Sequence, residues 1–275
     1  MSVLLALGAA VAYGLADFVG GLVSHRVSPW AVALVAQVGG ALVLLVAALV
    51  VPGNPSTADF AWAGAAGVAN GFGTAFLYRG LSRGRMAVVA PVSGVGAAVV
   101  PVLAGLALGE RPSLLAALGM VLALPGIWFV SRQPLGTTTS TSGWIDGVLA
   151  GVGFGSLFVL LARIESGAGL LPLALNQAVA AVAVVAVAMA LGAAWLPRES
   201  RALLGTISGV LGGLATIGFL YATYGGYLSI TAVLTSLYPA VTVLLAASLL
   251  REHIHRSQAL GLALCAAAVV LVATS

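Results

Sequence analysis

Apolar residues gather into runs of membrane-spanning length, which are separated by short stretches that contain Pro, Gly, Arg or acidic residues. A transmembrane helix needs about 20 consecutive apolar residues, so each run predicts one such helix. We therefore expect an all-α integral membrane protein with ten transmembrane helices. The runs cover residues 3–23, 30–51, 60–78, 86–108, 113–131, 144–162, 170–192, 203–221, 227–250 and 257–273.

A Gly/Thr/Ser-rich segment, residues 134–143, lies near the midpoint of the chain and is typical of a flexible linker. It separates a first predicted five-helix repeat, residues 1–133, from a second, residues 144–275. The two segments resemble each other when aligned with a shift of 141 to 143 residues. Glu110 then matches Glu252, Ser93 matches Ser236 and the Phe-Leu-Tyr sequence at 76–78 recurs at 219–221.

An odd number of spans in each repeat predicts that the second copy is inserted upside down relative to the first. Inverted repeats are typical of secondary transporters, whose substrate site lies near the bilayer midplane between the copies. The repeat therefore predicts both an architecture and a class of function.

Composition agrees with this interpretation and excludes other classes. Hydrophobic residues make up 61% of the chain, charged residues 7%, and the mean hydropathy is +1.15, whereas soluble domains carry about 25% charged residues. The net charge of +4 comes from Arg between the apolar runs, which indicates membrane topology and not nucleic-acid binding. Cys265 lies in an apolar run, and His253 and His255 are spaced two apart, so we expect no disulfide, metal site or cofactor.

Near the end of the second half, Ser236 and Pro239 are followed after thirteen residues by Glu252 and then by Gly261. This pattern resembles the end of the EamA-type domain of the drug/metabolite transporter superfamily. The first half has Glu110 at the matching place but Ala97 where the pattern has Pro. The resemblance implies a ten-span carrier of metabolites or drugs. It implies no particular substrate.

Asp17 is the one acidic residue that we expect well inside an apolar run. A charge at the centre of a transmembrane helix costs about 2.5–3.5 kcal/mol on insertion scales, so such a residue usually faces a cavity or a partner. Asp17 is therefore a candidate for proton coupling or substrate binding. The alternative is a structural pair with Arg26 or with a polar group on a neighbouring span.

Uncharged polar residues form a second group of candidates for the substrate or proton pathway, and hydrogen bonding between helices would also explain them. Tyr78 and Tyr221 are instead predicted to anchor span ends at the membrane interface. The pathway candidates besides Asp17 are Tyr13, Gln37, Asn70, Ser93, Asn176, Gln177, Ser236 and Tyr238.

Glycines spaced four apart predict close helix packing, and Glu110 and Glu252 are predicted to cap or pair at the turns beside Arg111 and Arg251. The glycine sets are Gly67 and Gly71; Gly105 and Gly109; Gly147, Gly151 and Gly155; and Gly205, Gly209 and Gly213.

Arg residues distribute unequally between the two sides of the membrane. The odd-numbered connections between runs hold nine Arg and the even-numbered ones hold Arg111 and Arg163. The positive-inside rule then places both termini outside, whereas the family resemblance implies cytoplasmic termini.

We expect a multi-pass protein of the plasma (inner) membrane that is monomeric or homodimeric. Its expected partners are lipid and a small-molecule substrate, with protons as a candidate coupling ion.

A secondary transporter that works by alternating access is the function that we expect. The alternatives are a membrane scaffold or sensor without transport, and an intramembrane enzyme. The sequence disfavours the enzyme because all three His lie at connections, away from any Ser at membrane depth. The sequence also lacks a phosphate-binding Gly-Lys-Ser/Thr loop, so we expect that ATP does not drive the protein directly.

Overall fold

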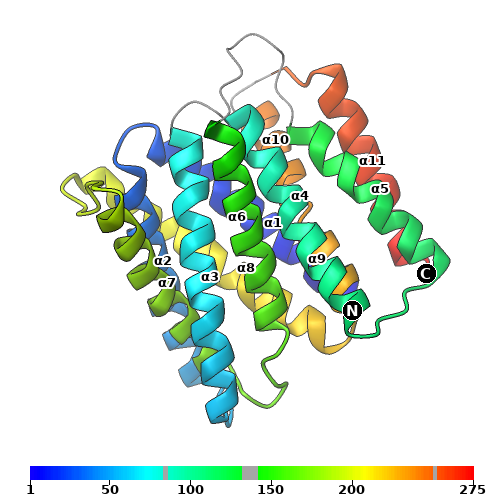
Figure 1. The fold of residues 1–275 in the computed structure, drawn as a ribbon, viewed down its shortest axis with the longest axis horizontal. Coiled ribbons are helices and arrows are strands. Elements are labelled where there is room, and N and C mark those ends of the chain that lie inside the picture. The colour runs from blue at the N-terminus through cyan, green and yellow to red at the C-terminus, as the bar shows by residue number, and fades with distance from the viewer. Residues whose placement is uncertain (83–85, 132–141, 250–252) are drawn as a thin grey trace.

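The structure, a computed structural model, describes residues 1–82, 86–131, 142–249 and 253–275 (Figure 1). All regular secondary structure in these ranges is helical. The first half contains α1 (Ser2–Ser24), α2 (Pro29–Val50), α3 (Thr57–Ser82), α4 (Met86–Ala107) and α5 (Leu114–Ser131). The second half contains α6 (Ser142–Leu161), α7 (Leu171–Ala190), the short η1 (Ser200–Leu204), α8 (Gly205–Tyr224), α9 (Leu228–Thr235), α10 (Tyr238–Leu249) and α11 (Arg256–Ala273).

Helices of one half pack mainly against helices of the other half. The pair α1–α8 corresponds to the pair α6–α3, and α2–α8 corresponds to α7–α3. The pairs α2–α7 and α5–α11 each join one helix to its own counterpart. The same set of contacts is thus obtained when the halves are exchanged, as a repeated five-helix unit requires.

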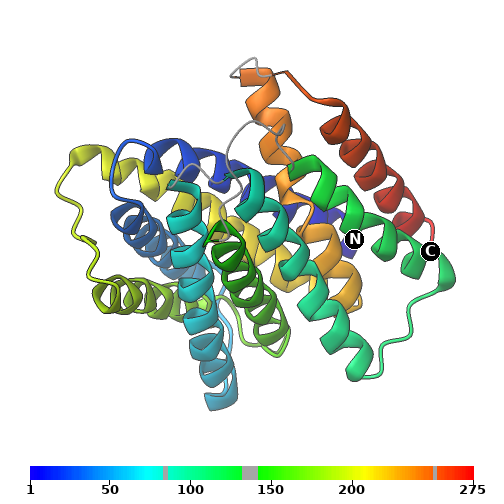
Figure 2. The same cartoon turned by 45° about the horizontal axis from the view of Figure 1, so that its top comes forward.

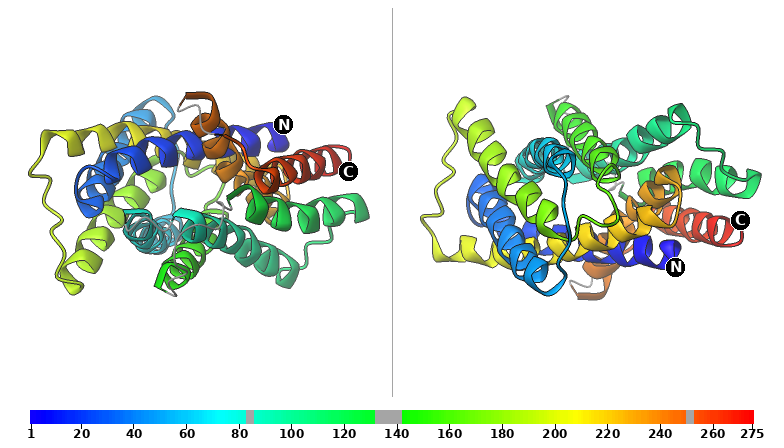
Figure 3. Two further views of the ribbon diagram at one scale, coloured as in Figure 1. Left: turned by 90° about the horizontal axis from the view of Figure 1, so that it is seen from above. Right: turned by 90° about the horizontal axis from the view of Figure 1, so that it is seen from below.

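The pairing of counterpart helices also determines the two edges of the bundle. The pair α5–α11 forms one edge and α2–α7 the opposite edge, with the remaining helices between them (Figures 1 and 2). Both chain termini lie at the α5–α11 edge, as the views from above and below also show (Figure 3).

Glycine permits the closest contacts between the halves and within them. A Cβ atom on Gly209 of α8 would lie 1.9 Å from the carbonyl oxygen of Ala36 in α2. On α3, a Cβ on Gly71 would lie 2.4 Å from the carbonyl oxygen of Ala180 in α7. Real Cβ atoms cannot approach so closely, so these helix crossings require glycine. Close packing is confirmed for the sets at 67 and 71, at 147 to 155, and at 205 to 213.

Gly105 and Gly109 do not form a helix-packing pair, so this prediction was wrong. Gly109 has a φ of 91° at the end of α4, a left-handed conformation that glycine adopts without steric cost. Gly105 lies under the carboxylate of Glu110 and leaves room for it. Both glycines therefore shape the turn after α4.

Glu110 caps a helix of the other half. Its two carboxylate oxygens accept hydrogen bonds from the backbone N–H groups of Leu228 (2.6 Å) and Ser229 (3.0 Å), at the start of α9. The carboxylate thus satisfies unpaired donors at a helix N-terminus, where the helix dipole also favours negative charge. Glu110 therefore caps a distant helix, and the prediction that it acts at the turn beside Arg111 was wrong.

The ninth apolar run, predicted as a single span at 227–250, is divided. Helix α9 ends at Thr235 and α10 begins at Tyr238. Pro239 lacks a backbone N–H, and its ring would clash with the carbonyl group of Thr235, four residues earlier. The corresponding helix α4, which has Ala97 in place of that proline, is continuous over Met86–Ala107.

Several helices are long and apolar enough to cross a bilayer. In the described parts of the chain these are Ser2–Ser24, Pro29–Val50, Gly143–Leu161, Leu171–Ala190, Ser200–Tyr224, Leu228–Leu249 and Arg256–Ala273, with shorter apolar helices at Val92–Ala107 and Leu114–Val130. Large apolar side chains on their outer faces, such as Leu49 (79% exposed) and Leu114 (77% exposed), suit contact with lipid. Residues 134–141 of the predicted linker 134–143 and the predicted cap by Glu252 lie outside the described residues, and residues 142–143 already belong to α6.

Candidate functional site

A cavity lies between the two halves and is lined by α1, α2 and α3 from the first half and by α6, α7, α8 and α10 from the second. Its interior has about 70 Å³ of space for the centres of water-sized molecules, and a single water needs roughly 10–15 Å³ on that measure. The cavity is therefore a narrow, water-sized space in this conformation, and a metabolite would need it to widen.

Equivalent positions of the two repeats meet in this cavity. Tyr13 on α1 and Phe154 on α6 are repeat counterparts, and both line it. The same holds for Asp17 and Phe158. Gln37 and Gln177, which occupy similar places in the two repeats, line the cavity as well. The cavity therefore follows the symmetry of the fold, and the one charge among its described lining residues lies in the first half, at Asp17.

Asp17 is the one charged residue among the described residues that line the cavity. It is partly exposed, and no hydrogen bond or ion pair joins it to another described residue. The pair with Arg26 that the sequence allowed is not formed. Its surroundings are phenol rings, because Tyr13, Tyr78 and Tyr238 are all close enough to interact electrostatically with its carboxylate.

Tyr78 lies inside this site, so its predicted role as an interface anchor was wrong. Its side chain is 3% exposed, and its hydroxyl group is 3.2 Å from the hydroxyl group of Ser208 on α8. Ser208 in turn donates a hydrogen bond of 2.6 Å to the carbonyl oxygen of Ala16 on α1. Tyr221, its repeat counterpart, is 38% exposed and does not line the cavity.

A network of side-chain amides forms one wall of the cavity. Asn70 on α3 donates to Gln177 (2.7 Å) and Asn176 (3.2 Å), both on α7. Gln37 on α2 donates to Asn70 (3.4 Å) and to the Thr74 hydroxyl (3.0 Å). The sequence left open whether these amides serve the pathway or hold helices together, and the structure places them at a helix junction that also faces the cavity.

Six of the nine predicted pathway residues line the cavity: Tyr13, Asp17, Gln37, Asn70, Gln177 and Tyr238. Asn176 lies behind the wall, fully buried and bonded to Asn70. Ser93 and Ser236 are also fully buried and do not line the cavity. Residues that the sequence analysis missed are Thr74, Tyr78, Ser208 and Thr216, which add hydroxyl groups to the cavity.

Thr216 shows why such hydroxyls are hard to predict. Its side chain is 3.0 Å from the hydroxyl group of Tyr13, yet it also donates 2.8 Å to the carbonyl of Gly212, four residues earlier. Threonine within an apolar helix commonly makes this local bond. From sequence it is therefore indistinguishable from a structural residue.

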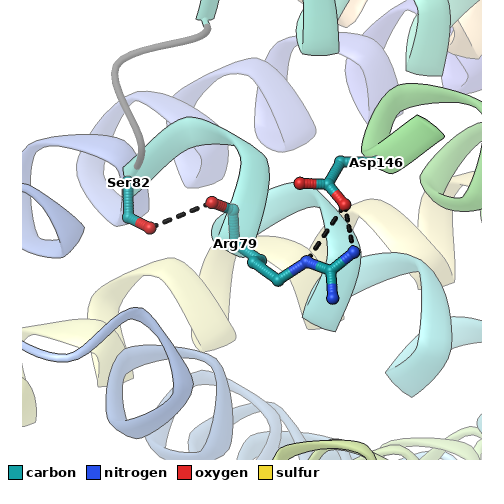
Figure 4. A network of polar contacts seen from close by, with 3 residues as sticks. All are labelled: Arg79, Ser82 and Asp146. Atoms are coloured by element: carbon teal, nitrogen blue, oxygen red, sulfur yellow. Dashed lines mark hydrogen bonds and ion pairs between the residues drawn. The ribbon is translucent and has the colours of Figure 1, made fainter. Parts of the chain in front are cut away.

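A buried ion pair lies beyond the cavity, near the ends of α3 and α6 (Figure 4). Asp146, which is 1% exposed, accepts a hydrogen bond of 3.0 Å from Nε of Arg79 and a second contact from the same guanidinium group. The guanidinium also stacks over the ring of Phe76, 4.4 Å from its centroid. Asp146, like Asp59 (2% exposed), is thus a buried acid. The sequence analysis did not single it out because it lies near the start of its apolar run, 144–162.

Comparisons with known proteins agree with this architecture. Sixteen chains of solved structures match, and one crystal structure of a protein superposes with a TM-score of 0.75 at 17% sequence identity, over 99% of this chain and 96% of that chain. At this identity the likeness shows the fold alone. No curated protein matches the sequence.

A family model matches both halves separately, over residues 1–132 and 141–274. Its description is the EamA-like transporter family. The match covers nearly the whole chain and agrees with the exchange of contacts between the two five-helix units. The chain is therefore a multi-pass integral membrane protein that belongs to the EamA-like transporter family.

Proposed function

We propose that this protein is a secondary transporter that carries a small metabolite or drug-like solute across the plasma membrane by alternating access. In this proposal it has no catalytic activity. Ten spans form two inverted repeats, with α9 and α10 together as the ninth span. The cavity between the repeats is the substrate site, and Asp17 exchanges a proton during transport.

The observation that carries the proposal is an acid without a partner in a cavity that both halves build. Removing a carboxylate from water is costly unless its charge is neutralised or paired. Asp17 faces the cavity and has no ion-pair partner among the described residues, so a proton or a cationic solute would neutralise it. A scaffold would gain nothing from such a group.

Alternating access requires the halves to move against each other around the site. Glycine-lined contacts such as Gly96 against Gly151, and Gly73 against Gly153, bring smooth surfaces together between α4 and α6 and between α3 and α6. These surfaces have few side chains that interlock, which suits small rigid-body movements.

A bulky side chain introduced into the cavity tests the proposal. Gly212 of α8 lines the cavity, and a Cβ atom there would meet no other atom within 4 Å. Gly212→Phe should therefore fill the cavity without disturbing a helix contact. Gly8 of α1 is exposed and equally open, so Gly8→Phe is a matched control outside the cavity.

The measurement is uptake of a panel of labelled solutes into vesicles that contain the purified protein, with and without a pH gradient. We expect at least one solute to enter through the wild type and the Gly8→Phe variant, and at least tenfold slower uptake through Gly212→Phe, about 1.4 kcal/mol in barrier. Uptake through Gly212→Phe equal to that of the wild type would mean that the transport pathway lies elsewhere. A wild type that takes up no solute of the panel would favour a scaffold.

A further inference from the structure

The charges and rings around the cavity also indicate what kind of solute it accepts. Among its described lining residues, one carboxylate is the charged group, and Arg and His do not occur there. An anionic solute would meet the carboxylate of Asp17 without a compensating cation. A zwitterion would have one charge matched and the other left unpaired, which is costly in a largely apolar site.

Aromatic rings surround the same carboxylate. Tyr13 contacts Phe158, with ring centroids 6.1 Å apart, and Tyr238, with centroids 6.4 Å apart. The first contact is tilted and the second is T-shaped, so the rings present faces in different directions. Tyr78 and Phe154 add further rings to the lining. Ring faces attract cations, and this attraction strengthens when water is excluded.

The polar wall offers little to a competing anion. The amide N–H groups of Gln37 and Asn70 already donate to neighbouring side chains. The hydroxyl of Ser208 donates to a backbone carbonyl. The amide N–H of Gln177 and the hydroxyl of Tyr238 have no acceptor among the described residues, so an anion would find these neutral donors but no cation. A cation would find the free carboxylate of Asp17 and the ring faces.

We propose that the cavity selects monovalent organic cations with an aromatic or bulky apolar group, which pair with Asp17 and stack on the tyrosine and phenylalanine rings. The proposal rests on the proposed function only in taking the bound cation to be the transported solute. Binding of the cation can be measured without any transport.

Three ligands that share a phenyl group but differ in charge test the selection: phenyltrimethylammonium, L-phenylalanine and 3-phenylpropionate. Their affinities are measured by calorimetry on the purified full-length protein in nanodiscs. We expect phenyltrimethylammonium to bind at least about tenfold more tightly than the zwitterion or the anion. Asp17→Asn, which keeps the shape of the side chain, should weaken its binding by roughly thirtyfold.

Glu199→Gln is the matched control, because Glu199 is an exposed acid that does not line the cavity. Its affinity for phenyltrimethylammonium should equal that of the wild type. Thermal unfolding without ligand checks that Asp17→Asn is folded. The proposal is overturned if the wild type fails to bind the cation, if either other ligand binds as tightly, or if Asp17→Asn binds the cation unchanged.

Flux measurements separate this proposal from the proposed function. Tight cation binding without uptake of any solute would leave the selection intact and contradict the carrier. Uptake confined to anionic or zwitterionic solutes would support the carrier and overturn the selection.

Discussion

The hydroxyl groups of Tyr78 and Ser208 lie 3.2 Å apart and connect α3 of the first half to α8 of the second. Ser208 has a single hydroxyl proton and donates it to the carbonyl of Ala16, so Tyr78 is the donor to Ser208. Gly20 of α1 lies directly beneath, where a Cβ atom would be 2.2 Å from the tyrosine hydroxyl oxygen. Three helices thus meet at one hydroxyl pair on the cavity wall.

Removing the Tyr78 hydroxyl should weaken this junction modestly. Tyr78→Phe loses a buried hydrogen bond between neutral groups and should lower the free energy of unfolding by about 1 kcal/mol. Gly20→Ala should cost more, because the new methyl group displaces the tyrosine. The measurement is unfolding of both variants in detergent.

The double variant is the sharper test of this geometry. Because the phenylalanine ring has no hydroxyl group for the methyl group to strike, Gly20→Ala should be less destabilising in the Tyr78→Phe background than in the wild type. Strictly additive effects would mean that the two side chains do not meet.

Glu110 should stabilise the start of α9 through its charge. Glu110→Gln keeps an acceptor but loses the charge-assisted hydrogen bonds to Leu228 and Ser229, so we expect a loss of about 1 kcal/mol. Thermal unfolding measures it. Glu199→Gln, whose side chain makes no capping bond, should unfold like the wild type. Equal melting of both variants would contradict the cap.

The Arg79–Asp146 pair should be costly to break from one side. Arg79→Met leaves the 1% exposed Asp146 without its cation, and we expect a loss of about 3 kcal/mol. Adding Asp146→Leu removes the stranded charge and should restore part of the lost stability. Unfolding of the two single variants and the double variant measures the coupling, and a double variant less stable than Arg79→Met would contradict this account.

Asp59 should make stability depend on pH in the acidic range. It lies in the first turn of α3, just before the apolar run. Burial alone would raise the pKa of its carboxyl, but hydrogen bonds from the backbone N–H of Glu165 (2.9 Å) and from the N–H and hydroxyl of Ser56 (2.8 and 2.7 Å) hold the pKa below its usual value. The charged form is therefore the one that the folded state stabilises.

The direction of this pH dependence follows from the linkage between proton binding and folding. A lowered pKa in the folded state contributes stability at pH values above the unfolded pKa, about 3.9, and this contribution is lost as the pH falls towards the folded pKa. Melting temperature measured from pH 6 downwards should fall more steeply for the wild type than for Asp59→Asn. Parallel curves would show that this carboxylate makes no such contribution.

Much of the site could be predicted because charge and amides are rare in apolar helices. Asp17, Gln37 and Gln177 are conspicuous in such runs, and the two glutamines occupy similar places in the two repeats. The fold class followed from the apolar runs, and the family followed from the residue pattern near the end of each half. The two glutamines line the cavity as expected.

Other features depend on tertiary contacts that sequence spacing does not reveal. Tyr78 looks like an interface anchor because it ends an apolar run, but α3 continues to Ser82 and keeps this tyrosine inside the bundle. Glu110 lies 118 residues before the N–H group of Leu228 that it caps. The difference between Gly105 and the packing glycines likewise arises from that capping carboxylate.

The central claim is that Asp17 exchanges protons for solute in the cavity. The most direct measurement is the internal pH of dye-loaded vesicles that contain the protein, followed after a transported solute is added outside at equal initial pH. We predict that solute entry drives protons out through the wild type and raises the internal pH. Asp17→Asn, which a thermal unfolding transition shows to be folded, should produce no change in internal pH. An equal pH change through Asp17→Asn, or solute uptake by the wild type without any pH change, would contradict the claim.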